Sequence, residues 1–186
     1  MNEEGDRAVP ITEIERAAAE AALEAHRALL ASGSTCATAE SLTGGLIGAH
    51  MTSVPGSSAT YRGGLVTYAT DAKSTLLGVP EELLAEHGAV HPDVARHMAV
   101  GARRAVEADY AISVTGVAGP DPQDGRPVGT VFAAVAGPGS RTRVARFSFT
   151  GDRSGIRYHT VEGALRLLTT TVREERGAEP DNDPFG

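Results

Sequence analysis

The 186-residue chain lacks several features that mark common classes of protein. Its one cysteine, Cys36, excludes an internal disulfide framework and a cysteine-rich zinc site. No apolar stretch approaches the roughly 18 to 20 residues of a membrane span, and the acidic N-terminus lacks the apolar core of a secretory signal. We therefore expect a cytoplasmic protein that does not contact a membrane, with Cys36 buried in a strand and inert.

Positive charge is also scarce, since 17 basic against 24 acidic residues give a formal net charge of −7. This balance argues against nucleic acid as a partner, although a local basic pocket for one phosphate remains compatible with it. The glycine-rich stretch "GVAGPDPQDG" lacks the Gly-Lys-Ser/Thr ending of a P-loop, and no strand exit carries GxGxxG. The usual fingerprints of ATP hydrolysis and dinucleotide binding are therefore missing.

What the chain does have is the composition of a globular domain, with 41% hydrophobic and 22% charged residues. Helix-like and strand-like segments alternate, which predicts an α/β fold with helices packed on a sheet. A hairpin-like pair of late strands makes that sheet mixed. We expect a single domain over residues 11–173 and flexible tails at 1–10 and 174–186. The predicted helices span 11–32, 43–54, 71–77, 80–87, 91–109 and 152–174, and the predicted strands span 34–39, 61–69, 110–116, 129–137 and 142–151.

Ligands of α/β proteins gather where strands end and helices begin. Three strand exits, at residues 40–45, 68–73 and 115–120, carry hydroxyls, glycines or an amine. In the first, "TAESLTGG", Ser41 stands where a strand stops and a glycine-opened helix starts. A hydroxyl there faces the free N–H groups of the helix, a setting that stabilises an alkoxide or an oxyanion. The alternative is that Ser41 only caps the helix.

A serine nucleophile needs a base, and no histidine lies in the three strand exits. The spacing of His87, His91 and His97 loosely suggests metal ligands, but Pro92 breaks their common face, so we expect no metal site. Lys73 is the only lysine of the chain. Its pKa would have to fall from about 10.4 toward 7–8 for it to act as a base, and partial burial can cause such a fall. A solvated surface lysine is the alternative.

Further side chains at these exits can assist. The hydroxyls of Tyr68 and Thr115 can relay a proton or orient the pair, or they can serve strand packing and a turn. Arg153 and Arg62 can neutralise a substrate phosphate, or they can be solvated surface charges. Asp71 is expected to cap the helix that carries Lys73.

Four separated blocks of the sequence resemble the CinA C-terminal domain family, in the family's order. They are "AESLTGGLIGAHMTSVPGSSATYRGGLVTYATDAKSTLLGV", "GAV", "SVTGVAGPD…GRPVGTVFAAVAG" and "FTGDRSGIR". The resemblance covers about residues 12–172 and implies a three-layer α/β/α domain with a mixed, mostly parallel sheet. It also implies a homodimeric amidase without cofactor or metal, which deamidates nicotinamide mononucleotide to nicotinate mononucleotide and ammonia in pyridine-nucleotide salvage. The chain resembles the stand-alone form, without the large N-terminal domain.

The resemblance also implies roles for individual residues. Ser41 is the nucleophile, Lys73 is its base, and Tyr68 and Thr115 complete the catalytic group. Oxyanion and substrate binding are expected at Thr43, Gly44, Gly45, Gly116, Gly119 and Arg153.

Some positions depart from the family's pattern. Leu42 replaces a small residue or cysteine, and His91 replaces a common serine. The loop "DPQDGR" has fewer glycines than usual, which bears on contacts with phosphate and ribose. Two other functions stay open: a catalytically silent nucleotide-binding or regulatory module, and an interaction domain linked to competence or the DNA damage response.

Overall fold

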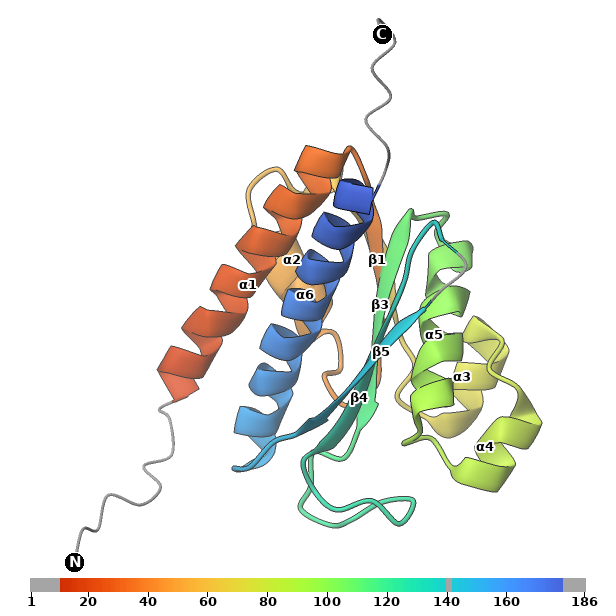
Figure 1. Cartoon of the computed structure of the whole chain (residues 1–186). Coiled ribbons are helices and arrows are strands. Elements are labelled where there is room, and N and C mark those ends of the chain that lie inside the picture. Colours follow the sequence, from red (N-terminus) through yellow and green to blue (C-terminus); the bar gives the residue numbers. More distant parts are fainter. Residues whose placement is uncertain (1–10, 140–141, 179–186) are drawn as a thin grey trace, which may run out of the picture.

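A computed structural model describes residues 11–139 and 142–178 of the chain (Figure 1). The predicted tail at 1–10 and the last eight residues of the other predicted tail lie outside the described residues. Among the helices that the structure describes, none combines the length and the apolar character needed to cross a membrane.

Five strands form one sheet in the order β2-β1-β3-β4-β5. Their bounds are β1 Cys36–Glu40, β2 Tyr61–Val66, β3 Tyr110–Gly116, β4 Thr130–Ala136 and β5 Arg143–Ser148. Strand β1 pairs in parallel with β2 and with the central strand β3, whereas β4 pairs antiparallel with β3 and β5. The mixed sheet is confirmed. Parallel pairs do not outnumber antiparallel pairs as expected, because β3, β4 and β5 are joined without crossover helices.

Helices cover both faces of the sheet, which confirms the three-layer α/β/α fold (Figure 1). The first layer holds α1, α2 and α6, and the second holds α3, α4 and α5. Strands β3 and β4 are buried almost throughout, because both of their faces are covered. The helices are α1 Ile11–Ser32, α2 Leu46–Ser53, α3 Thr70–Leu77, α4 Glu81–His87, α5 Pro92–Ala105 and α6 Arg153–Ala178, with a short 3-10 helix η1 at Ser57–Ala59.

Several predicted helix ends differ from the structure, and α2, for example, begins at Leu46 and not at residue 43. Helix α6 continues to Ala178, so the segment predicted as a tail from residue 174 begins as helix. Helix α3 has Ala69 at its N-cap, and Asp71 lies in the first turn instead of capping it. Helix α5 stops at Ala105, and Glu107 beyond it has a φ of 52°, which does not continue a right-handed helix.

The register of the sheet brings two predicted strand exits together. Glu40, the last residue of β1, pairs with Val66 of β2 on one side and Val114 of β3 on the other. Because these three strands are parallel, the residues that follow them leave the sheet at the same edge. Ser41 and Thr115 therefore start from neighbouring strand ends.

Candidate active site

A cavity of about 160 Å³ lies at these strand ends. The four predicted catalytic residues line it, as do Gly116, Gly119 and Arg153. Thr43, Gly44 and Gly45 are not among its lining residues. The structure thus brings three strand exits to one cavity, but Gly44 and Gly45, which were expected to bind the oxyanion, do not line it.

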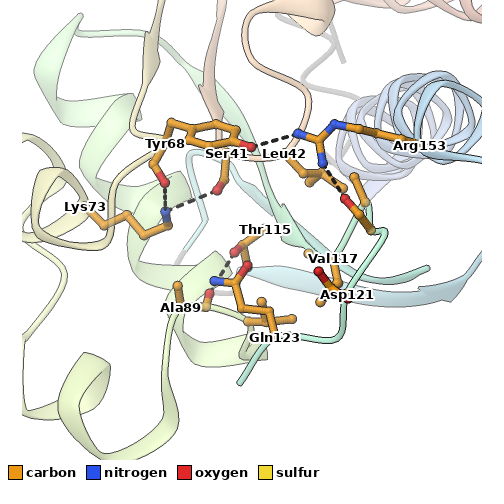
Figure 2. A pocket seen from close by; sticks show the side chains of 14 residues that line it. Ser41, Leu42, Tyr68, Lys73, Ala89, Thr115, Val117, Asp121, Gln123 and Arg153 are labelled. Atoms are coloured by element: carbon orange, nitrogen blue, oxygen red, sulfur yellow. Dashed lines mark hydrogen bonds between the residues drawn. The ribbon is translucent and has the colours of Figure 1, made fainter. Parts of the chain in front are cut away.

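Ser41 and Lys73 form a hydrogen bond inside this cavity. Lys73 Nζ lies 3.1 Å from Ser41 Oγ, and only 1% of the lysine surface is exposed (Figure 2). The ammonium also donates to the carbonyl oxygens of Thr67, at 2.7 Å, and Tyr68, at 3.4 Å. The long side chain of Lys73 therefore extends from α3 past the end of β2, and its amine contacts Ser41. The alternative of a solvated surface lysine is wrong.

Burial changes the acidity of this lysine. Removal of the ammonium from water lowers the pKa of Lys73 from its ordinary value of 10.5 to about 8, against the opposing influence of the Asp124 carboxylate. About a tenth of the lysine would then be neutral at pH 7. A neutral amine keeps two N–H groups for the carbonyls of Thr67 and Tyr68 and presents its lone pair to Ser41.

Thr115 faces the same cavity from the end of β3 (Figure 2). Its hydroxyl donates to the carbonyl oxygen of Ala89 at 2.7 Å. The Asp124 carboxylate accepts from the N–H groups of Ala89, at 2.7 Å, and Val90, at 3.1 Å. Since the only proton of the Thr115 hydroxyl is engaged, this oxygen is left to accept hydrogen bonds from a ligand.

Arg153, in the first turn of α6, spans the mouth of the cavity (Figure 2). Its guanidinium donates to the Tyr68 hydroxyl at 2.8 Å and to the Gly119 carbonyl oxygen at 2.6 Å. The Tyr68 hydroxyl thus points to Arg153, whereas its backbone carbonyl contacts Lys73. This geometry gives Tyr68 a place at the mouth and no direct contact through which its phenol would relay a proton to Lys73.

Glu40, which precedes Ser41, was not identified from the sequence. One of its carboxylate oxygens accepts from the Thr43 hydroxyl at 2.7 Å and from the N–H groups of Gly45 and Ile47 at 3.0 Å. The other accepts from the N–H of Gly48 at 2.8 Å. The buried carboxylate therefore takes up the N–H groups at the start of α2. The only charged residue of the strand "CATAE", at its end, was the available signal.

Arg157 is the second residue that sequence reasoning missed. It lies one helical turn after Arg153 in α6 and donates to the carbonyl oxygens of Leu42, at 3.0 Å, and Thr43, at 2.8 Å. The spacing of the two arginines in "DRSGIR" puts them on one side of a helix, a signal present in the sequence. Its contacts attach the segment after Ser41 to α6.

Other candidates from the sequence lie outside this arrangement. Arg62 donates to the carbonyl oxygen of Val106 and does not line the cavity, so its proposed place in a phosphate site is wrong. The rings of His87 and His91 stack with centroids 4.4 Å apart. In residues 11–139 and 142–178, no three His, Cys, Asp or Glu side chains are grouped to hold a metal ion. Burial raises the pKa of Cys36 to about 12, which suppresses its thiolate at neutral pH.

The fold and the cavity define a three-layer α/β/α protein with a buried serine–lysine pair at its parallel strand ends. This chain belongs to the CinA C-terminal domain family, whose model matches residues 18–172. It is 46% identical over 143 residues to the nicotinamide-nucleotide amidohydrolase PncC of Escherichia coli (strain K12), an alignment that covers 76% of this chain and 87% of that protein.

Two further proteins are similar to this chain, one in sequence and one in structure. A CinA-like protein of Geobacter sp. (strain M21) is 55% identical over 152 residues, which cover 78% of this chain. The chain spans only 36% of the length of that relative. The crystal structure of a CinA superfamily protein from Klebsiella pneumoniae 700603 superposes with a TM-score of 0.81 at 35% identity and covers 84% of this chain and 98% of that one.

Proposed function

We propose that this chain is an amidohydrolase that deamidates nicotinamide mononucleotide to nicotinate mononucleotide and ammonia. The observation that carries the proposal is the only lysine of the chain, buried and 3.1 Å from Ser41 Oγ. The similarity to the amidohydrolase PncC supports the same substrate class. A neutral carboxamide requires a nucleophile and a base, and this pair supplies both.

In the first half of the reaction, neutral Lys73 removes the hydroxyl proton of Ser41 while Oγ attacks the carboxamide carbon. The bond between Oγ and that carbon forms, and the carbonyl oxygen becomes an oxyanion. The ammonium of Lys73, held by the carbonyls of Thr67 and Tyr68, then gives its proton to the departing nitrogen. The carbon–nitrogen bond breaks, ammonia leaves, and the nicotinoyl group stays on Ser41 as an ester.

In the second half, water hydrolyses that ester. Lys73 is neutral again after ammonia has left, so it can take a proton from the attacking water. The second tetrahedral intermediate collapses as the bond to Ser41 Oγ breaks, and Lys73 returns the proton to Oγ. The product is released as a carboxylic acid, which gives its remaining proton to water and becomes a carboxylate, and the pair is restored without any change of oxidation state.

The mouth of the cavity suits the rest of a nucleotide. Arg153 is exposed there, and the backbone N–H groups of Ala118 and Gly119 donate to no described residue. A substrate phosphate would replace Tyr68 and Gly119 as partners of the guanidinium. Thr115 can accept from the carboxamide N–H₂.

We also propose that the enzyme acts as a homodimer in cytoplasmic pyridine-nucleotide salvage. The molecular mass of the protein, measured by sedimentation, tests the dimer.

The first experiment measures ammonia release from nicotinamide mononucleotide by the wild-type chain and by Ser41→Ala. Ser53→Ala is the matched control, because Ser53 is an exposed serine at the end of α2, away from the cavity. We expect release by the wild type and by Ser53→Ala, and a loss of at least about a thousandfold in Ser41→Ala.

The outcomes separate the alternatives. Release by both the wild type and Ser41→Ala would keep the activity and move the nucleophile elsewhere. A folded wild type that binds the nucleotide and releases no ammonia would overturn the proposal and favour a silent binding module.

A second prediction concerns the phosphate. Nicotinamide riboside, which lacks the phosphate, should be turned over with a higher KM than nicotinamide mononucleotide. Arg153→Gln should remove this difference in KM between the two substrates.

A further inference from the structure

Three of the five backbone N–H groups in the turn at residues 41–45 donate hydrogen bonds within the protein. The N–H of Ser41 donates to the Val114 carbonyl at 3.2 Å, and the N–H of Gly44 donates back to the Ser41 carbonyl at 3.0 Å. The N–H of Gly45 donates to Glu40. The two glycines that were expected to bind an oxyanion therefore have partners inside the protein.

Two donors of this turn differ from the rest. Among the residues that the structure describes, the N–H groups of Leu42 and Thr43 have no acceptor. Leu42 follows Ser41 directly and lines the cavity. In hydrolases that place a nucleophile at a strand-to-helix turn, the N–H of the next residue commonly binds the oxyanion. The same group is available here.

Arg157 fixes the peptide that joins Leu42 to Thr43, and through it the position of Leu42. Its guanidinium holds the carbonyls of Leu42 and Thr43 on the side of α6. In a trans peptide the C=O and the N–H point in opposite directions, so the N–H of Thr43 points away from α6. A cationic partner on the Leu42 carbonyl also polarises that peptide and makes the Thr43 N–H a stronger donor.

Glu40 holds the same turn from its other end. Its carboxylate accepts from the Thr43 hydroxyl and from three N–H groups at the start of α2. The positive end of that helix is thereby neutralised, so the helix start offers little to an oxyanion. A carboxylate and a guanidinium thus fix the turn through its N–H and its C=O groups, respectively.

Of the two donors at Leu42 and Thr43, only Leu42 lines the cavity, because Thr43 is fully buried. We infer that the N–H of Leu42 forms the oxyanion site, and that Arg157 and Glu40 are positioning residues that hold the turn around it in place. The inference rests on the proposed amidohydrolase function and deepens it. Neither positioning residue touches the substrate. Each acts through the backbone of the turn, so its loss should weaken the transition state more than the bound ground state.

The test compares the steady-state kinetics of Arg157→Ala, Arg157→Lys and Glu40→Gln with the wild type. Arg166→Ala is the control, because Arg166 is an exposed arginine of the same helix that pairs with Glu162. We expect kcat to fall about tenfold to a hundredfold in Arg157→Ala, with KM and the dissociation constant of nicotinate mononucleotide little changed. Guanidinium at a non-denaturing concentration should restore part of kcat in Arg157→Ala only.

Several outcomes would overturn the inference while leaving the amidohydrolase intact. They are an unchanged kcat in Arg157→Ala, a rise in KM without loss of kcat, or equal stimulation of all variants by guanidinium. If Arg157→Ala does not fold, Arg157→Lys replaces it in the test. The lysine keeps the positive charge but cannot bind the carbonyls of both Leu42 and Thr43 as the guanidinium does. A kcat of Arg157→Lys equal to that of the wild type would contradict the inference. A wild type without ammonia release would instead overturn the proposed function, and this inference with it.

Discussion

The environment of Lys73 explains how a single amine can be both buried and charged. Its ammonium is removed from water, which favours the neutral form, but backbone carbonyls of the β2 exit accept its protons. A buried lysine without acceptors would stay neutral, and one in water would stay charged. The proposed reaction needs both states in turn, so an intermediate pKa of about 8 suits it.

Replacement of Lys73 by arginine is expected to lower turnover sharply. The guanidinium keeps the positive charge but cannot give up its proton at neutral pH, so Ser41 would have no base. General bases contribute about a hundredfold to ten-thousandfold, and we expect a loss of kcat in this range. Ammonia release measures it, and Arg104→Lys on the surface of α5 serves as the reverse control. Substantial activity in Lys73→Arg would show that another group accepts the serine proton.

The pH dependence follows from the direction of the shift at Lys73. Because the neutral amine is the active form, kcat/KM should rise with pH and level off above about pH 8. The Asp124 carboxylate raises the pKa of Lys73, so its removal should move the rising limb to lower pH. Asp124→Asn tests this, because the amide oxygen can still accept from Ala89 and Val90. A limb that stays in place or moves to higher pH would contradict the assignment.

At the scale of elements, the position of α3 depends on close contact with α5. Gly101 of α5 lies against the carbonyl of Leu77, which ends the helix that carries Lys73. A Cβ at Gly101 would come within 2.0 Å of that oxygen, a distance that forces the two helices apart. The glycine is therefore required by packing and not by an unusual φ.

Gly101→Ala is accordingly expected to destabilise the fold by about 1 to 3 kcal/mol and to lower activity by displacing Lys73. Urea denaturation and ammonia release measure the two effects. Gly177→Ala is the matched control, because it also lies in a helix and its added Cβ meets nothing within 4 Å. That variant should be neutral or stabilised by up to about 1 kcal/mol. Equal stabilities of the two variants would refute the packing argument.

The sequence predicted elements better than it predicted their contacts. Periodicity and punctuation by glycine and proline predicted the α-helices and strands that the structure describes, though not the short helix η1, and strand exits led to Ser41 and Lys73. Glu40 and Arg157 carried usable signals, which are a carboxylate in an otherwise uncharged strand and a repeated arginine on one helix face. Asp124 carried none, because its partners at Ala89 and Val90 lie 34 residues or more away in the chain. Only the assembled fold reveals that contact.

For the whole molecule, the cost of burying Lys73 should appear in the pH dependence of stability. The folded-state pKa of about 8 lies below the ordinary value of 10.5, so the folded state disfavours the ammonium. Below pH 8 the lysine is protonated in both states and the full cost is present. Between pH 8 and pH 10.5 the lysine is protonated in the unfolded chain but not in the folded chain. The free energy of unfolding therefore rises with pH in this window.

Lys73→Met isolates this contribution, because every other titrating group is common to both proteins. Relative to Lys73→Met, the wild type should gain up to about 3 kcal/mol of unfolding free energy as the pH rises through this window. Urea titrations of both proteins at neutral pH and near pH 10.5 measure the change. The absolute difference at neutral pH also contains the carbonyls that methionine leaves without a donor, so the pH-dependent part carries the argument. If the difference in unfolding free energy between the two proteins stays constant or shrinks with rising pH, the folded state does not lower the pKa of Lys73. The proposal that Lys73 is the base would then lose its physical support.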